Sequence, residues 1–451
     1  MDSSHMTLGA PITVGADEVM AELGDFLRIP SVSTLLAHKG DIARAAGWVA
    51  DYLTRAGLDH VAVIPTVGHP LVYADWLHAA GQPTVLIYGH YDVQPAEPLE
   101  PWHSPPFEPT VRDGNVYARG AADDKGQVYI HLKAVAELLR REGALPVNVR
   151  FLIEGEEEIG GKGIEEYVAA HPAALGCDAI LISDSPMFAP GQPAICTGLR
   201  GSVFGTLTVR TGRQDLHSGL YGGVAPNAVN ILCAIIAGLT DAQGRCTLPG
   251  YYDAVRPPSA AERAAWAALP FDVEAYRAHE VGAPALLPDA ERTVLERVWG
   301  WPTFDANGIL GGFTGEGSKA IIPAEARCNL SLRLVPGQEP AAVVAALRAR
   351  IAALCPAWAT HALVIHGLAA PVVLPTDLPV MHAAADALAA VFGRPPVFTR
   401  MGGSIPIVSL FQAHLHAPCV MMGFGLPDDN LHAPNEKMAL ANITGGITAA
   451  A

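Results

Sequence analysis

The sequence predicts an α/β protein with a mixed, largely parallel sheet, into which a second, α+β domain is inserted. Strands and amphipathic helices alternate along the first part of the chain, which is typical of a parallel sheet covered by helices. This pattern changes near residue 199 and resumes near residue 380. In addition, 451 residues are more than one hydrophobic core usually organises.

The first domain is expected over residues 7–198 and 375–451. Helical apolar spacing predicts helices at 16–28, 41–57 and 124–141. Short β-rich runs predict strands at 61–64, 71–76, 84–88, 147–153 and 179–183. Ligands of such sheets bind where strands end and loops begin, so polar residues at these strand ends are candidates for function.

The inserted domain is expected over residues 199–374. Residues 203–211 and 326–335 alternate between apolar and polar side chains, which indicates strands with one solvated face. A helical pattern follows each of them, at 225–239 and 341–354, and a Pro- and Ala-rich segment separates the two pairs. We therefore expect a β-α-β-α arrangement.

Composition and charge exclude several classes of function. Asp and Glu (45) outnumber Lys and Arg (29), and the net charge of −16 disfavours binding to nucleic acid or to an anionic membrane. We find no apolar stretch of about 18 residues that predicts a transmembrane helix, and no signal peptide. The seven cysteines lack C-x-x-C spacing, which predicts free thiols in a reducing cytoplasm.

Histidine and aspartate residues follow several predicted strands. His90 and Asp92 come directly after the strand at 84–88, and in an extended segment they point to the same side. This pair suits a metal-bound imidazole that a carboxylate orients, although a solvated polar loop is the alternative. Asp184 follows the strand at 179–183, and His432 precedes a predicted final helix.

Two acidic clusters accompany these residues. In the segment 119–126, Asp123 or Asp124 could simply cap the following helix. The run Glu154-Gly155-Glu156-Glu157-Glu158 places four carboxylates after a buried strand. They require nearby cations or raised pKa values, unless the run is a solvated acidic loop. Together, the carboxylates and imidazoles at strand ends are the ligands expected of a pair of divalent metal ions.

These motifs resemble those of the co-catalytic zinc exopeptidase family that includes carnosinase, cytosolic nonspecific dipeptidase and acetylornithine deacetylase. The carnosinase-like dipeptidase branch is the most similar, over about residues 20–448. The resemblance implies a catalytic metal-binding domain with an inserted lid and dimerisation domain. It also implies a homodimer that hydrolyses an amide bond in dipeptides or N-acyl amino acids with a free carboxylate. The resemblance further implies two divalent metal ions per chain. Zn²⁺ is the expected ion, and Mn²⁺ or Co²⁺ are the alternatives.

The resemblance also implies which residues bind the metal ions. Asp123 is expected to bridge the two ions. His90 and Asp184 are expected to complete one site, and Glu158 and His432 the other.

Three further residues are implied in catalysis. Glu157 is expected to be the general base that activates water, and Asp92 is expected to orient His90. His217, in a His-Ser-Gly turn of the inserted domain, is expected to reach across a dimer interface and to hydrogen-bond the developing oxyanion.

Four residues are implied in substrate binding. Arg333 is expected to bind the substrate carboxylate, for which its planar guanidinium is suited. Gly403 and Ser404 belong to a Gly-Gly-Ser turn near the same carboxylate, and His366 matches a further pocket histidine.

Three positions depart from the pattern of this branch. Met401 replaces an acid that would help to hold a substrate ammonium group, Ala320 replaces a threonine, and Leu368-Ala369-Ala370 replace a polar stretch. Met401 favours the alternative of a deacylase or carbamoylase acting on N-substituted amino acids. A non-catalytic binding protein is the other alternative, and the retention of Glu157 with all five ligand residues argues against it.

Overall fold

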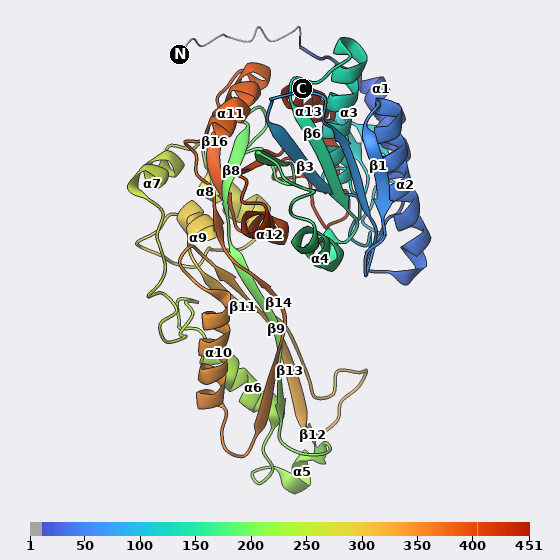
Figure 1. Cartoon of the computed structure of the whole chain (residues 1–451). Helices are drawn as coiled ribbons and strands as arrows, with labels where there is room; N and C mark the ends of the chain where they lie inside the picture. Colours follow the sequence, from blue (N-terminus) through green and yellow to red (C-terminus); the bar gives the residue numbers. More distant parts are fainter. Residues whose placement is uncertain (1–10, 404) are drawn as a thin grey trace. The chain divides into compact units, whose positions relative to one another are not determined.

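A computed structural model describes residues 11–403 and 405–451, which cluster into two compact units (Figure 1). Unit 1 contains the described residues up to Thr197 together with Leu374–Thr399 and Leu410–Ala451. Unit 2 contains the described residues of Gly198–Val373 and Arg400–Ser409.

Unit 1 is built on a mixed sheet whose central strands are parallel. These are, in spatial order, β6 (Asn148–Glu154), β3 (Thr84–His90), β7 (Ala179–Ile182) and β17 (Cys419–Met421). Antiparallel strands flank them, namely β2 (Leu71–Trp76) and β1 (Asp59–Ile64) beside β6, and β8 (Ala194–Leu199) beside β17. The sheet continues from β8 to β15 (Val372–Val373) and β16 (Val397–Met401). The predicted mixed α/β class is confirmed.

The helices of unit 1 cover this sheet. They are α1 (Ala16–Leu27), α2 (Lys39–Ala56), α3 (Lys125–Glu142), α4 (Lys162–Ala170), α11 (Pro379–Phe392) and α13 (Leu440–Ala450); the residues of α12 (Pro406–His414) are divided between the two units. The first eleven residues of α3 are buried on all sides, because α3 lies between the sheet and the helices α1, α2 and α13. Gly446 allows α13 to approach closely, since a Cβ atom there would lie 2.8 Å from Ile130.

A small antiparallel sheet that the sequence did not predict joins two loops of unit 1. Its strands are β4 (Thr110–Arg112), β5 (Asn115–Tyr117) and β18 (Lys437–Ala439). Tyr117 pairs with Lys437, so the chain that leaves β5 runs beside the chain that enters β18. The loop containing Asp123 follows β5, and the loop containing His432 precedes β18. This pairing therefore brings together loops that lie about 300 residues apart.

Unit 2 contains a four-stranded antiparallel sheet with helices on one face (Figure 1). The strand order is β11 (Thr303–Gly311), β13 (Glu325–Leu334), β9 (Gly201–Arg210) and β14 (Thr360–Ala369). The helices α6 (Ala228–Ala237) and α10 (Pro340–Leu354) pack on the apolar face, where Val203 and Leu207 are fully buried. Phe204 and Thr206 alternate with them and belong to the opposite face.

The remaining elements of unit 2 are short. The Pro- and Ala-rich segment forms α7 (Ala260–Ala267), α8 (Val273–Ala275), a π-helical turn η3 (Tyr276–Val281) and α9 (Val294–Gly300). Capping boxes formed by Ser259 with Glu262 and by Thr293 with Glu296 start α7 and α9. The two-residue strand β10 (Leu216–His217) pairs with β12 (Ile321–Ile322), and the short helix α5 (Ser218–Tyr221) follows β10 directly.

Two expectations from composition concern the whole chain. Within residues 11–403 and 405–451, no helix is long and apolar enough to cross a bilayer. The seven cysteines are free thiols.

Candidate metal centre and active site

Three parallel strands deliver polar residues to one edge of the sheet in unit 1. His90 is the last residue of β3 and pairs in register with Glu154, the last residue of β6. Asp184 comes two residues after β7, which is the other neighbour of β3. Because parallel strands end at the same edge, their carboxyl ends gather these side chains, as the sequence predicted.

The loop that presents Asp123 is organised by a single buried carboxylate, that of Glu436. Its Oε2 accepts hydrogen bonds from Arg119 Nη1 (2.7 Å) and from the backbone N–H of Gly120 (2.9 Å). Its Oε1 accepts from the backbone N–H groups of Ala122 (2.9 Å) and Asp123 (3.1 Å). Glu436 and Arg119 are both almost completely buried. This ion pair therefore fixes the loop from inside the protein.

The two carboxylate oxygens of Asp123 face two different imidazoles. Oδ1 lies 3.1 Å from Nε2 of His90, and Oδ2 lies 2.9 Å from Nε2 of His432. The same His432 nitrogen lies 3.3 Å from Oε1 of Glu158. Two groups of three result, His90–Asp123–Asp184 and Asp123–Glu158–His432, and within each group the candidate ligand atoms lie within 4.8 Å of one another. Asp123 belongs to both groups.

The polar atoms at the centre of these groups fit a metal site. His90 Nε2 and Glu158 Oε1 are buried, and neither has a hydrogen-bond partner among the described residues despite the short distances to neighbouring groups. Buried polar atoms are normally hydrogen-bonded, so atoms that converge without doing so are arranged as ligands around an ion. The simple capping interpretation fails for Asp124, which is the N-cap residue of α3 but makes no side-chain cap bond. Its Oδ2 instead accepts from the backbone N–H of His90 (3.2 Å).

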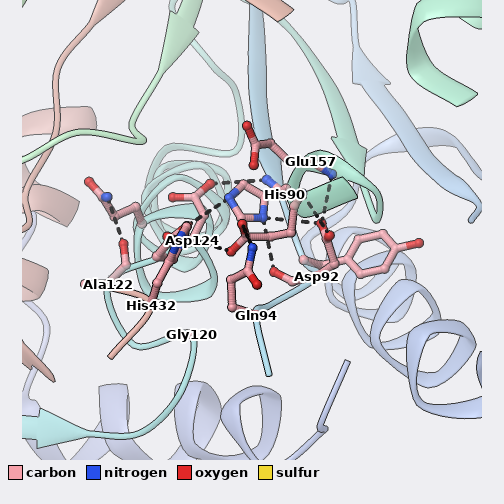
Figure 2. A network of polar contacts seen from close by, with 12 residues as sticks. His90, Asp92, Gln94, Gly120, Ala122, Asp124, Glu157 and His432 are labelled. Atoms are coloured by element: carbon pink, nitrogen blue, oxygen red, sulfur yellow. Dashed lines mark hydrogen bonds and ion pairs between the residues drawn. The ribbon is translucent and has the colours of Figure 1, made fainter. Parts of the chain in front are cut away.

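Asp92 connects the β3 loop to the acidic run (Figure 2). Its Oδ1 lies 3.3 Å from Nδ1 of His90, on the side of the ring opposite to Asp123. Oδ1 and Oδ2 also accept hydrogen bonds from the backbone N–H groups of Glu157 and Glu158, each at 3.2 Å. Gln94 donates to Oε2 of Glu158 (2.8 Å). Glu157 and Glu158 begin the 3-10 turn η2 (Glu157–Ile159), so one carboxylate positions an imidazole and two neighbouring glutamates.

Burial alters the protonation of this cluster. It raises the pKa of Glu157 well above the ordinary value, and it raises the pKa of Glu154 to about 8 although Tyr88 donates a hydrogen bond to that carboxylate. Burial and then the charge of Asp123 raise the pKa of Asp184 to about 7. At Asp123 burial acts in the same direction, but the imidazoles of His432 and His90 beside its two oxygens lower its pKa below the ordinary range. The acidic run is therefore not a solvated loop.

The candidate oxyanion donor His217 lies in unit 2, at the end of β10. Its Nδ1 accepts a hydrogen bond from the backbone N–H of Gly219 (3.0 Å), and the backbone of Ser218 donates to the carbonyl of Ala320 (2.9 Å). A neutral imidazole whose Nδ1 accepts must carry its proton on Nε2. The exposed His217 ring is thus held as an Nε2–H donor.

The candidate substrate residues of unit 2 lie on the sheet face opposite to α6 and α10. Arg333 stands near the end of β13 with its guanidinium 5.2 Å from the ring centroid of Phe204. His366 Nε2 lies 2.8 Å from Oγ1 of Thr206. Phe204 and Thr206 are two residues apart on β9, so Arg333 and His366 share this face.

The glycine turn that follows β16 is held by an arginine. Arg200 Nε donates to the carbonyl of Gly402 (2.8 Å), and Met401 and Gly403 flank that residue. Ser404, the remaining predicted residue of this turn, lies outside the described residues.

Comparison with known proteins identifies the family. Residues 86–451 match the peptidase family M20/M25/M40. The chain belongs to this family. It is 32% identical to the Beta-Ala-His dipeptidase of Homo sapiens over 457 residues (96% of this chain, 89% of that protein). It is 31% identical to the cysteinylglycine-S-conjugate dipeptidase of Corynebacterium striatum (97% and 95% covered). The solved M20 family metallo-carboxypeptidase of Sulfolobus solfataricus aligns with a TM-score of 0.88 and 32% identity (96% and 98% covered).

The predicted resemblance is confirmed, and this M20 peptidase is a hydrolase. Sequence reasoning missed two of its site residues, Glu436 and Gln94. Glu436 lies four residues after His432 in the same motif, but a glutamate in a turn is normally exposed, and only the fold reveals its burial. Gln94 lies two residues after Asp92, and the same i, i+2 argument that paired His90 with Asp92 could have selected it.

Proposed function

We propose that this M20 peptidase hydrolyses the amide bond of dipeptides or N-acyl amino acids that carry a free carboxylate, with two divalent metal ions per chain. The observation that carries the proposal is the position of Asp123, whose two oxygens face His90 and His432 from two separate loops. That is the arrangement expected of a bridging ligand. Two relatives named as dipeptidases support the class of substrate.

We assign the ions to the two groups that share Asp123. His90 and Asp184 complete one site, and Glu158 and His432 complete the other. Imidazole nitrogen and carboxylate oxygen suit Zn²⁺ and also accept Mn²⁺ or Co²⁺. Ions bound there would supply Lewis-acid chemistry, which polarises the scissile carbonyl and lowers the pKa of water toward neutrality.

We assign Glu157 as the general base. Its carboxylate accepts the proton of the attacking water and then gives that proton to the leaving nitrogen, so that no proton is gained or lost over the cycle. Burial, which raises its pKa, helps Glu157 to retain the proton until the C–N bond breaks. The backbone bond from Glu157 to Asp92 holds the base in place.

We assign Arg333 to the substrate carboxylate and His217, from a partner subunit, to the oxyanion. The Nε2–H tautomer of His217 supports the second role. Apolar side chains in the segment after His217 support a homodimer, because Leu220 is 76% exposed and Val224 is 88% exposed, and such residues gather at interfaces. In this proposal, the partner subunit supplies the oxyanion donor to each site.

A substrate panel with the Zn²⁺-loaded chain tests the proposal. Dipeptides with a free carboxylate should be hydrolysed, and the same dipeptides amidated at that end should be poor substrates. Glu157→Gln should retain two metal ions per chain and lose about 10²–10⁴-fold in kcat, because a neutral amide accepts no proton. Near-normal turnover of this variant contradicts the assigned base.

The same panel separates the alternative functions. N-blocked amino acids hydrolysed in preference to free dipeptides would favour a deacylase or carbamoylase, for which Met401 at the end of β16 is the supporting observation. A chain that binds two metal ions but hydrolyses neither class would be a binding protein.

A further inference from the structure

A cavity of about 910 Å³ lies within unit 2, in the size range of small-molecule sites. One wall comes from the segment 243–302, which includes Tyr252, Tyr276 and Trp301. The other comes from the strands β11 and β13, which include Ser331 and Arg333. The roles assigned above use Arg333 but not the cavity beside it.

The cavity borders Arg333, and its lining residue Arg200 contacts the glycine turn, so both elements assigned to the substrate carboxylate lie beside its wall. Arg333 lines it directly. Arg200 also lines it and donates to the carbonyls of Gly402 (2.8 Å) and Trp301 (3.3 Å). A Cβ atom on Gly402 would lie 2.9 Å from Nη2 of Arg200, so glycine permits this close approach. A substrate residue held by Arg333 and the glycine turn would therefore have its side chain next to this cavity.

Positive charge predominates in the lining although the whole chain has a net charge of −16. The five lining arginines are Arg200, Arg245, Arg292, Arg297 and Arg333, and the three lining carboxylates are Asp289, Glu291 and Asp305. Asp289 and Glu291 both pair with Arg292, at 3.3 and 3.2 Å. Two of the three carboxylates are thus engaged by one arginine.

Arg297 has unused hydrogen-bonding capacity. Its Nη1 donates to the carbonyl of Leu287 (2.6 Å), but its buried Nε has no hydrogen-bond partner in the described part of the chain. Arg297 also forms no ion pair within residues 11–403 and 405–451. Burial and then the charge of Glu280 raise the pKa of the Tyr276 phenol, and the nearby charges of Arg200 and Arg297 oppose this rise.

The guanidinium groups of Arg200 and Arg333 are also close to each other. Burial lowers the pKa of Arg200 to about 10, and the charge of Arg333 contributes in the same direction. Arg333, Arg200 and Arg297 therefore form one cationic region that extends from the arginine assigned to the substrate carboxylate into the cavity, and the charge of Asp305 offsets part of the charge of Arg200 and Arg333.

Resting on the proposed function, we infer that this cavity accepts the side chain of the carboxy-terminal residue of the substrate and selects an acidic one, glutamate or aspartate. A partly desolvated guanidinium with free N–H donors binds a carboxylate strongly and in a defined orientation. The substrates are thus dipeptides or N-acyl amino acids that end in a dicarboxylic residue.

Isosteric substrates test the inference on the Zn²⁺-loaded full chain. Ala-Glu and Ala-Gln have nearly the same shape and differ in charge, and Ala-Leu tests an apolar side chain. We expect kcat/KM for Ala-Glu to exceed that for Ala-Gln and Ala-Leu by about 10-fold or more at low salt. The preference should shrink at high ionic strength. Equal rates, or a preference for Ala-Leu, overturn the inference.

Two arginine variants locate the preference. Arg297→Gln should bring the Ala-Glu to Ala-Gln ratio close to one, whereas Arg297→Lys should keep part of it. Arg245→Gln is the matched control, because Arg245 lines the same cavity but pairs with Asp241 at 2.7 Å. That control should keep the ratio of the native chain. A ratio that survives Arg297→Gln, or that falls equally in the control, contradicts the role of Arg297.

Product binding separates this inference from the proposed function. By isothermal calorimetry, the full chain should bind L-glutamate about 10-fold or more tightly than L-glutamine, since the product keeps both carboxylates. Absence of all peptidase activity with this binding preference intact refutes the proposed function alone. If dipeptides are hydrolysed but Ala-Glu and Ala-Gln have equal kcat/KM, and L-glutamate and L-glutamine bind equally, the inference alone is refuted. Should Arg297→Gln fail to fold, these native-chain measurements decide the question.

Discussion

Oδ1 of Asp92 accepts a hydrogen bond from the backbone N–H of Glu157 at 3.2 Å, and the same atom lies 3.3 Å from Nδ1 of His90. The carboxylate assigned to orient a metal ligand therefore also positions the assigned base. The second carboxylate oxygen of Asp92, Oδ2, accepts a hydrogen bond from the backbone N–H of Glu158 at 3.2 Å, so the same side chain also positions Glu158. A change at Asp92 should consequently alter both metal affinity and proton transfer.

Asp92→Asn separates these two effects. An asparagine amide has one acceptor oxygen, so either the N–H of Glu157 or that of Glu158 loses its partner. We expect Zn²⁺ affinity to fall by no more than about 10-fold, because the variant removes the carboxylate charge 3.3 Å from Nδ1 of His90 but keeps the backbone carbonyl of residue 92, which lies 3.1 Å from the same nitrogen. At saturating Zn²⁺, kcat should remain at least about 10-fold below the native value, because the base is misplaced. Full recovery of kcat at saturating metal would restrict Asp92 to orienting His90.

Glu436→Gln tests whether the buried ion pair with Arg119 holds the Asp123 loop. Glutamine keeps the shape but leaves the Arg119 charge unpaired, which costs about 3 kcal/mol when both partners are buried. We expect the thermal midpoint of the metal-free chain to fall by roughly 5–10 °C. Glu165→Gln, at an exposed position of α4, is the matched control and should change little. Equal midpoints for the two variants would show that Glu436 does not support the loop.

The sequence predicted the regular elements well because their side-chain periodicity is local. The helix predicted at 124–141 is α3 (Lys125–Glu142), and the strand predicted at 147–153 is β6 (Asn148–Glu154). Positions at strand ends followed from the same pattern, which is why His90 and Asp184 could be selected. The roles proposed for Asp123 and His432 required the family resemblance, since the proximity of these two residues depends on the pairing of β5 with β18.

The features that the sequence did not predict depend on contacts between residues that are far apart in the chain. The strands β5 and β18 are three residues each, too short to produce a periodic signal. The burial of Glu436 and the cavity in unit 2 arise from segments that are distant in sequence. A Pro- and Ala-rich segment gives no sign that its arginines line one cavity.

His131 gives the chain a predicted pH dependence of stability. Burial lowers its pKa from 6.5 to about 4, and its Nε2 lies 2.7 Å from Oγ of Ser183. Between pH 6.5 and 4 the unfolded chain therefore binds a proton at His131 that the folded chain does not. Stability should rise with pH across this window and be lost as the pH falls, with a contribution of about 3 kcal/mol. Above pH 6.5 the contribution should be constant.

His131→Gln removes this titration while an amide N–H can still donate to Ser183. The thermal midpoint of the metal-free chain, measured from pH 4 to 7, should vary less with pH in the variant than in the native chain. Metal-free protein is needed because acid also displaces metal ions from histidine and carboxylate ligands. Parallel pH profiles for the two chains would assign the acid sensitivity to other groups.

The final prediction concerns the proposed dimer. If His217 acts in the site of a partner subunit, each site combines Glu157 of one chain with His217 of the other. His217→Ala should lower kcat more than it raises KM, because the oxyanion forms only on the path to products. Glu157→Gln should also be nearly inactive, for lack of the base. A hybrid dimer of the two variants, however, contains one site in which both residues are intact.

Mixing the two variants after mild dissociation should therefore restore activity, to at most about a quarter of the native value, because half of the dimers are hybrids with one intact site. Mass spectrometry of intact dimers verifies that hybrids have formed. A mixture of Glu157→Gln with Glu157→Gln, His217→Ala double-variant chains is the control, since none of its dimers contains an intact base. Absence of recovery in verified hybrids would place His217 in the site of its own chain or outside catalysis. A fully active monomer would exclude the exchange of His217 altogether.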